Sequence, residues 1–191
     1  MVQLDFLRHG ETEQGGGLRG CLDDQLTATG WQQMITSTAD ASGWQRIISS
    51  PLRRCAHFAE RLAEERGLPI EYNDNLRELH FGAWEGKHPS ELMLDQADEL
   101  GRFWADPYAY TPPGGEPLLD FAARIDTALD ALHLAYAGQR LLVVSHAGVM
   151  RLLLARARGL APADLLQVVV GYAELVGLEF APQQGLKEVG L

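Results

Sequence analysis

Two histidines each follow a short run of hydrophobic residues, although they lie far apart in the sequence. His9 comes just after the run that ends at Leu7, and His146 comes just after the run 141–144. If both runs are strands of one parallel sheet, their carboxyl ends border the same crevice, where such sheets bind ligands. Gly10 follows His9 and would allow close approach of a ligand to the backbone. The sequence therefore predicts one site that contains both histidines.

Two segments could supply cations for an anion in that site. Arg8 precedes His9, and its guanidinium offers a fork of donors that matches phosphate oxygens. Arg53 and Arg54 lie where the second predicted strand passes into a helix, and a helix N-terminus favours an anion. Because basic residues are unfavourable in the first turn of a helix, their presence favours a functional role for one of them. This combination is typical of a phosphate-binding nucleophile.

The elements that must position these residues alternate along the chain. Strands are predicted at 2–7, 46–49, 70–72, 141–144 and 174–180, and helices at 27–41, 51–66, 90–105, 118–137 and 149–158. The segment 76–117 is irregular and rich in Gly, Pro and Trp, which indicates an excursion over the sheet edge rather than a second domain. The pattern predicts an α/β fold, a three-layer α/β/α sandwich with a mostly parallel central sheet, as one domain over 1–191.

Composition narrows the classes of function. The chain has 191 residues, 46% of them hydrophobic, and no linker or internal repeat. The net charge of −10 argues against generic binding to nucleic acid or to anionic membranes, so an anionic ligand would need a local cationic pocket. Cys21 and Cys55 fit a reducing compartment and form no metal-ligand pattern. With no apolar stretch long enough for a membrane span and no signal peptide, we expect a cytoplasmic protein.

The motifs occur in an order that resembles the histidine phosphatase superfamily, which has the phosphoglycerate-mutase-like fold. The matching segments are RHGET at 8–12, Leu26-Thr27 with Gly30, SPLRR at 50–54, ELHFGAWEG at 78–86, Gly115-Glu116, and VVSHAGV at 143–149. RHG alone is a weak signal, but the ordered set is specific and covers nearly the whole chain.

The resemblance implies a role for each matching residue. His9 would be the nucleophile that forms a phosphohistidine, and it must be a neutral imidazole to attack phosphorus. Arg8, Arg54 and His146 would bind the oxygens of the phosphoryl group in transfer. Glu78 would protonate the leaving alcohol and later activate water. No metal or cofactor enters this scheme.

The sequence departs from the family pattern in one loop. Gly15 occupies the position where many relatives have an asparagine, so the usual amide contact is missing. Either Arg19 or the backbone N–H groups of 15–17 could replace it. The pattern S-x-L-x-R selects Arg54 over Arg53. Further substrate contacts are assigned to Gly10, Ala147 and Trp84.

Within the superfamily, the excursion most resembles that of the α-ribazole phosphatases. This implies a phosphomonoester hydrolase of cobalamin biosynthesis that acts on α-ribazole 5′-phosphate or adenosylcobalamin 5′-phosphate. Mutases of the superfamily tend to be longer, with segments that close the site, so hydrolysis is favoured. The nucleoside-like base of such a substrate would need an aromatic wall to stack on. The excursion is rich in aromatic residues, namely Phe81, Trp84, Phe103, Trp104, Tyr108 and Tyr110. For each of them, a place in a satellite core is an equal alternative.

Other functions stay open. The first is a broad-specificity sugar-phosphate or phosphoglycerate phosphatase, or a mutase-like protein, with the same catalytic set. A second is a protein phosphohistidine phosphatase. A non-catalytic phospho-ligand binding module would predict loss of His9, Glu78 or His146, and all three are present. We expect a small-molecule phosphomonoester as the partner and no nucleic acid or membrane. The oligomeric state, including a homodimer, and the order of the tail 183–191 stay open.

Overall fold

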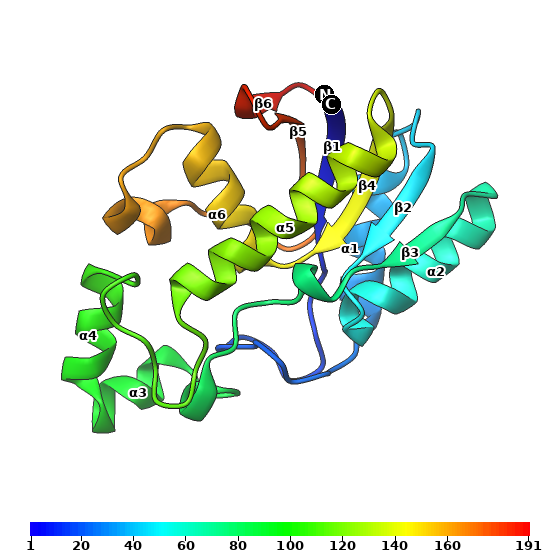
Figure 1. Ribbon diagram of the computed structural model, residues 1–191. Helices are drawn as coiled ribbons and strands as arrows, with labels where there is room; N and C mark the ends of the chain where they lie inside the picture. The colour runs from blue at the N-terminus through cyan, green and yellow to red at the C-terminus, as the bar shows by residue number, and fades with distance from the viewer.

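The structure is a computed structural model that describes all of residues 1–191. Its centre is a six-stranded sheet (Figure 1). The strands are β1 (Val2–Arg8), β2 (Arg46–Ser49), β3 (Ile70–Tyr72), β4 (Arg140–Ser145), β5 (Leu175–Ala181) and β6 (Gly185–Val189). Their order across the sheet is β3-β2-β4-β1-β5-β6. The first four of these run parallel, whereas β5 and β6 pair antiparallel at one edge. The prediction of a mostly parallel α/β sheet is therefore confirmed.

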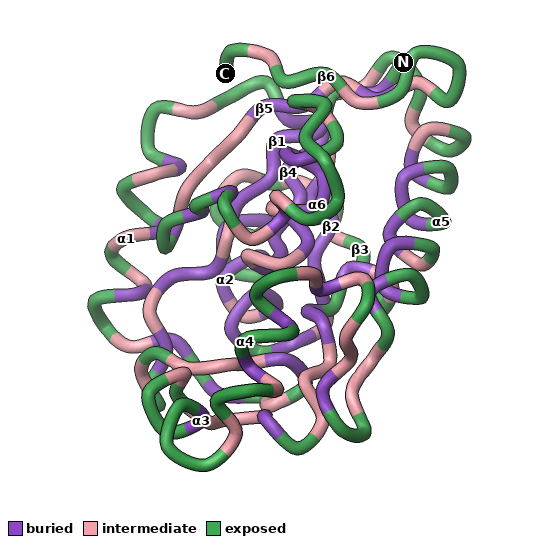
Figure 2. The backbone as a smooth tube through the Cα atoms, turned by 90° about the vertical axis from the view of Figure 1, so that its left-hand side faces the viewer, coloured by how far each residue is buried: buried purple, intermediate pink, exposed green.

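Helices cover both faces of this sheet. They are α1 (Ala28–Thr38) and α2 (Arg53–Arg66) on one face, and α5 (Leu118–Tyr136) and α6 (Ala147–Ala157) on the other. Leu141 and Val143 of β4 pack in the core under α5 and α6, whereas Leu142 and Val144 pack in the core under α1 and α2. Successive residues of a strand point to opposite faces, so a strand buried on both faces is a continuous apolar run. In Figure 2 the inner strands β1, β2 and β4 are accordingly mostly buried, whereas the edge strand β6 and the outer sides of the helices are exposed.

The excursion lies beyond the carboxyl ends of the parallel strands (Figure 1). It contains two single turns of 3-10 helix, η1 (Asp74–Leu76) and η2 (Gly82–Trp84), and two short α-helices, α3 (Pro89–Asp95) and α4 (Ala97–Ala105). A further 3-10 segment, η3 (Pro162–Gln167), follows α6. Leu76, Trp84 and Phe103 belong to the same core as the residues under α5 and α6. The excursion is therefore continuous with the main hydrophobic core.

The helices predicted at 90–105 and 51–66 differ from the structure, and the helix predicted at 27–41 already ends at Thr38. The helix predicted at 90–105 is two helices, because the backbone of Gln96 leaves the helical region and its side chain accepts a hydrogen bond from Trp84 Nε1 at 2.7 Å. α2 begins at Arg53 rather than at 51, because Leu52 is extended and its N–H donates to Ser50 Oγ at 3.4 Å. The tail 183–191, whose order the sequence left open, contains β6.

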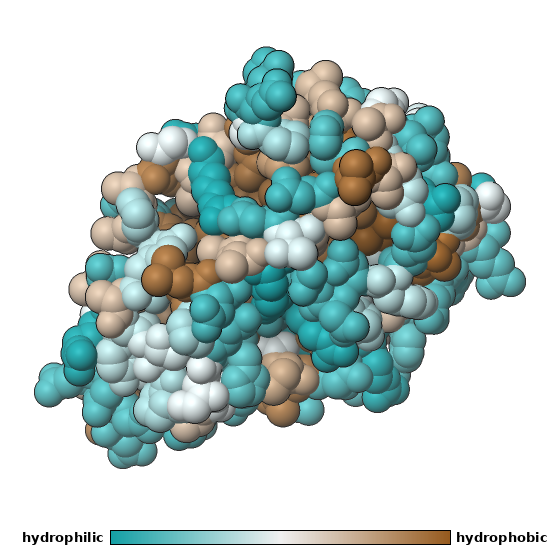
Figure 3. All heavy atoms as spheres, viewed as in Figure 1, coloured by the Kyte–Doolittle hydropathy of each residue, from teal (hydrophilic) through white to brown (hydrophobic).

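None of the helices combines the length and the apolar composition that crossing a bilayer requires. On the face drawn in Figure 3, hydrophobic side chains form small patches among hydrophilic ones.

Candidate active site

The carboxyl ends of β1, β2 and β4 bring the two histidines together. Just past β1, the backbone N–H of His9 donates to the carbonyl of Ser145 at 3.0 Å. Just past β2, the backbone N–H of Ser50 donates to the carbonyl of Val144 at 2.9 Å. The ring centroids of His9 and His146 are 5.4 Å apart. The prediction that both histidines lie in one site is confirmed.

The ring of His9 is held in one tautomer. Nδ1 lies 2.8 Å from the carbonyl oxygen of Gly10, and because a carbonyl can only accept, Nδ1 carries the proton. Nε2 therefore has the free lone pair. Burial lowers the pKa of His9 well below its ordinary value of 6.5, and the charges of Arg54 and Arg8 lower it further. The imidazole is thus neutral at pH 7, as a nucleophile must be.

His146 is fully buried behind His9 and does not line the pocket. Its Nε2 lies 2.7 Å from Ser50 Oγ and 3.7 Å from the sulfur of Cys55. Burial lowers the pKa of His146 well below its ordinary value, and the charge of Arg54 adds to this effect. Burial also raises the pKa of Cys55 to about 12, so the thiol stays protonated. The contact of His146 with a phosphoryl group stays a prediction.

Of the two arginines in the first turn of α2, Arg54 is buried and Arg53 is exposed. The two Nη atoms of Arg54 donate to three carbonyl groups of the loop 19–22, at 2.5, 2.9 and 3.1 Å. Nη1 also lies 3.5 Å from the buried carboxylate of Asp24. The Nε donor is buried and has no acceptor in the protein. Arg54 therefore holds the loop with one side of its guanidinium and keeps one donor uncommitted.

The guanidinium of Arg8 is likewise bonded to the protein on one side and has one donor without an acceptor. Its Nη1 donates to the carbonyl of Val170 at 2.7 Å, and its guanidinium carbon lies 4.2 Å from the centre of the Tyr172 ring. Its Nε is buried without an acceptor. Because buried donors are almost always paired, an anion bound at His9 is the acceptor that suits both arginines.

Glu78 reaches the site from the excursion. Its Oε2 accepts a hydrogen bond from the backbone N–H of Gly148 at 2.9 Å, in the first turn of α6, and its Oε1 accepts from Leu79 at 2.9 Å. A Cβ added at Gly148 would lie 2.1 Å from Oε1 of Glu78. Only glycine at this position allows the carboxylate to approach the helix so closely.

The segment that carries Glu78 is held by a side chain that sequence reasoning missed. Arg124 on α5 forms two hydrogen bonds with the carboxylate of Glu116, at 2.7 and 2.9 Å. It also donates to the carbonyls of Asn75 and Arg77, both at 2.7 Å, and of Glu78 at 2.9 Å. An isolated arginine on a predicted helix gives no signal of such a role, although Glu116 belongs to a recognised motif.

These side chains surround a pocket of about 550 Å³. Five of the predicted site residues line it, namely Arg8, His9, Arg19, Glu78 and Ala147. Much of the remaining wall is hydrophobic, with Leu18, Leu79, Phe81, Phe103, Trp104, Phe121, Leu165 and Leu166. Arg151 and Tyr172, which sequence reasoning did not single out, also line it.

Two residues predicted to contact the substrate do not line the pocket. The side chain of Trp84 is 0% exposed and packs against Phe103 and Tyr110, with ring centroids 5.6 and 6.0 Å away. It belongs to the core beneath the pocket rather than to the pocket wall. Gly10 does not line the pocket either, and a Cβ there would lie 2.2 Å from the carbonyl oxygen of Gly30. The glycine is needed for the close approach of these two backbone segments.

The glycine-rich loop that departs from the family pattern borders the pocket. Gly15, Gly17 and Arg19 all line it. Arg19 donates to the side chain of Gln14 at 2.8 Å and to its backbone carbonyl at 2.5 Å. The guanidinium is thus placed at the pocket, and its contact with substrate stays a prediction.

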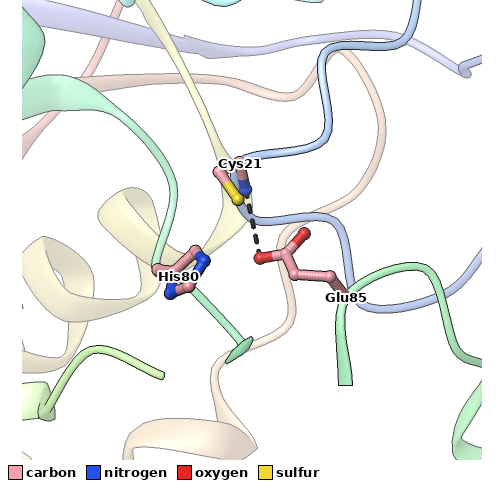
Figure 4. A group of neighbouring side chains, drawn as sticks. All are labelled: Cys21, His80 and Glu85. Carbon is pink, nitrogen blue, oxygen red and sulfur yellow. Dashed lines mark hydrogen bonds between the residues drawn. The ribbon is translucent and has the colours of Figure 1, made fainter. Parts of the chain in front are cut away.

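The carboxylate of Glu85 holds this loop against the excursion. It accepts four backbone N–H groups, from Gly20, Cys21, Leu22 and Phe81, at 2.9 to 3.4 Å. The side chains of Cys21 and His80 lie next to it (Figure 4), with donor atoms within 4.8 Å of one another. Because four N–H groups already occupy the carboxylate, we assign Glu85 to the structure of the loop rather than to metal binding.

The chain matches a family model over nearly its whole length. The model of the histidine phosphatase superfamily (branch 1) matches residues 4–189. The chain belongs to this superfamily. One similar protein is a bifunctional protein of Mycobacterium tuberculosis. It is 33% identical to this chain, over 94% of this chain and 50% of the relative. The chain thus spans about half the length of that relative.

Two further members resemble this chain over most of both lengths. An adenosylcobalamin/alpha-ribazole phosphatase of Escherichia coli is 31% identical over 86% of this chain and 83% of the relative. The structure of a mycobacterial glucosyl-3-phosphoglycerate phosphatase superposes with a TM-score of 0.81 at 28% identity, over 92% of this chain and 89% of that one. The superfamily and its fold, predicted from the ordered motifs, are confirmed.

We expect the free energy of unfolding to fall as the pH drops below about 6.5, partly because His9 and His146 are held neutral. Their pKa values are lowered by folding, so below the ordinary value the unfolded chain binds protons that the folded chain does not. Each histidine contributes up to about 1.4 kcal/mol per pH unit in this window. Urea unfolding of the wild type at about pH 7.5 and about pH 5.5 measures the loss.

The His9→Asn variant should lose less stability between the two pH values, because one of the two neutral imidazoles is gone. His57→Asn, which changes a partly buried histidine on α2, is the matched control. The same loss in His9→Asn as in wild type would contradict the prediction.

Proposed function

We propose that the protein is a phosphomonoesterase that works through a phosphohistidine at His9. The observation that carries this proposal is the geometry of His9, whose Nε2 has a free lone pair at a pocket that Arg8 lines. Arg54 is buried close to His9, and both arginines have an Nε donor without an acceptor. A neutral nucleophile beside cations suits attack on a phosphate dianion, because the cations attract the substrate and stabilise charge on the transferring group. Arg8 and Arg54 take this role, and His146 supports it from behind.

The leaving alcohol needs a proton, and Glu78 is the acid placed to supply it. Its carboxyl lines the pocket and is fixed by two backbone N–H groups. After the alcohol leaves, the same carboxylate takes a proton from water as the water attacks the phosphohistidine. The phosphate is released and both residues return to their starting states.

For the substrate, we propose α-ribazole 5′-phosphate, or the related adenosylcobalamin 5′-phosphate. The pocket supports a large leaving group, since Phe81, Phe103 and Trp104 contribute to a largely apolar wall that would pack against a base. The similarity to the phosphatase of E. coli supports the same choice.

A second substrate class is sugar phosphates and phosphoglycerates. The observation that favours this class is a further cation, Arg151, which lines the pocket. A phosphomonoester of a neutral alcohol would leave Arg151 without an anionic partner. The similarity to the glucosyl-3-phosphoglycerate phosphatase points in the same direction.

The test is kcat/KM for phosphate release from α-ribazole 5′-phosphate, 3-phosphoglycerate, fructose 1,6-bisphosphate and p-nitrophenyl phosphate, all in EDTA. A preference of about a hundredfold or more for the ribazole, which corresponds to about 2.7 kcal/mol of transition-state stabilisation, would select the first class. A preference for the phosphoglycerate would select the second class. Release from none of the four would contradict the proposed activity.

A further inference from the structure

One arginine of the pocket has no role in the mechanism above. Arg151 is half-buried on α6, and its Nε donates to the carbonyl of Val168 at 3.0 Å. Its two Nη groups make no hydrogen bond to the protein, and no carboxylate lies within ion-pair distance of them. The outer half of the guanidinium is therefore free, at a pocket that it lines.

The backbone after η3 places Arg151 beside Arg8. The carbonyl of Val168 binds Arg151, and the carbonyl of Val170, two residues further, binds Arg8 at 2.7 Å. Burial lowers the pKa of Arg8, Tyr172 and Glu78 raise it, and the positive charge of Arg151 lowers it. Two like charges held side by side disfavour each other unless an anion binds between or beside them.

Two arginines are already assigned to the phosphoryl group at His9. They are Arg8 and Arg54, and the buried Nε of each has no acceptor in the protein. Arg151 lines the same pocket with its Nη groups free. A second anion on a bound substrate would therefore find a pair of donors that the phosphoryl group does not need.

The charges of the pocket wall are unbalanced. Arg8, Arg19 and Arg151 line it, against the single carboxylate of Glu78. Gln14 engages both Nη groups of Arg19, whose buried Nε has no acceptor, and Arg8 is assigned to the transferring phosphoryl group. Arg151 is left as a half-buried cation with a free fork of donors, which matches the oxygens of a carboxylate or a phosphate.

We infer that Arg151 binds a second anionic group, carried by the leaving alcohol of the substrate, and so determines specificity among phosphomonoesters. This inference rests on the phosphomonoesterase activity proposed above and favours the second substrate class, because the leaving alcohol of α-ribazole 5′-phosphate carries no anion. Carboxylate and phosphate share the chemistry that a guanidinium fork recognises, so the test includes a pair of compounds for each.

The first pair is 3-phosphoglycerate and glycerol 3-phosphate, which differ in a carboxylate. The second pair is fructose 1,6-bisphosphate and fructose 6-phosphate, which differ in a phosphate. We expect wild-type kcat/KM to favour the more anionic member of at least one pair by tenfold or more, roughly the value of one charge-assisted contact. In Arg151→Met, which keeps the apolar stem, this preference should fall to about threefold or less, while the less anionic member changes little.

Two further variants separate recognition from structure. Arg151→Lys keeps the charge without the fork and should restore part of the preference. Arg156→Met removes an arginine of the same helix that pairs with Asp126 outside the pocket, and it should keep the wild-type preference. Equal losses for both members of each pair in Arg151→Met would show that Arg151 only holds the segment at Val168 and would overturn the inference.

Binding measurements distinguish this inference from the proposed function. The His9→Ala variant cannot turn over a substrate and therefore suits calorimetry. We compare the affinities of 3-phosphoglycerate and glycerol 3-phosphate for His9→Ala and for the double variant His9→Ala/Arg151→Met. Tighter binding of the carboxylate that disappears with Arg151→Met would support the subsite even if the wild type released no phosphate. Absence of any preference in both pairs, in turnover and in binding, would overturn it.

Discussion

We expect the His9→Ala variant to release phosphate from its best substrate on the order of 10⁴-fold more slowly than wild type. The reason is that Nε2 of His9 is the nitrogen with a free lone pair at the pocket, fixed by the hydrogen bond from Nδ1 to Gly10 at 2.8 Å. His146 cannot substitute for it, because that ring is fully buried and does not reach the pocket surface. The measurement is steady-state phosphate release at saturating substrate.

The intermediate itself can be observed. Rapid mixing of wild type with substrate, followed by intact-mass analysis, should show the mass of one added phosphoryl group, and His9→Ala should show none. His57→Ala, which changes a partly buried residue of α2 that does not line the pocket, is the control and should behave as wild type. Turnover by His9→Ala within about tenfold of wild type would exclude a phosphohistidine at this position.

The strands and the residues at their ends could be predicted because each leaves a local pattern. β2 and β3 begin and end at the predicted residues, β1 extends one residue beyond its prediction at the carboxyl end, and β4 extends one residue beyond its prediction at each end. Buried parallel strands are short continuous apolar runs, and ligand-binding residues follow their carboxyl ends. The positions of His9 and His146 follow from these two rules alone.

The side chains that hold the loops could not be predicted, because their partners lie far away in the sequence. Glu85 accepts four backbone N–H groups, Asp24 is buried beside Arg54, and Arg124 binds three carbonyls. Charged residues are mostly exposed, so a sequence gives no reason to bury a particular one. Trp84 shows the converse case, since its aromatic type fits a pocket wall and a core equally well and only packing decides.

Glu78→Gln should change the enzyme in a way that depends on the leaving group. For an alcohol ester we expect kcat/KM to fall on the order of 10²–10³-fold, because the alkoxide cannot leave without a proton. For p-nitrophenyl phosphate the loss should stay within about tenfold, because p-nitrophenolate is stable without one. The ratio kcat/KM is the appropriate measure, since it covers the steps up to departure of the alcohol and excludes hydrolysis of the phosphohistidine.

Structural damage must be separated from loss of the acid, because both oxygens of Glu78 accept backbone N–H groups and an amide retains only one acceptor. Gly148→Ala keeps the carboxyl but places a methyl group 2.1 Å from the position of Oε1, so the carboxyl must move. If kcat/KM of this variant also falls more for the alcohol ester than for p-nitrophenyl phosphate, the loss is due to the position of the acid. Glu65→Gln, on the exposed side of α2, is the control. Equal losses for both leaving groups in Glu78→Gln would mean that another group protonates the alcohol.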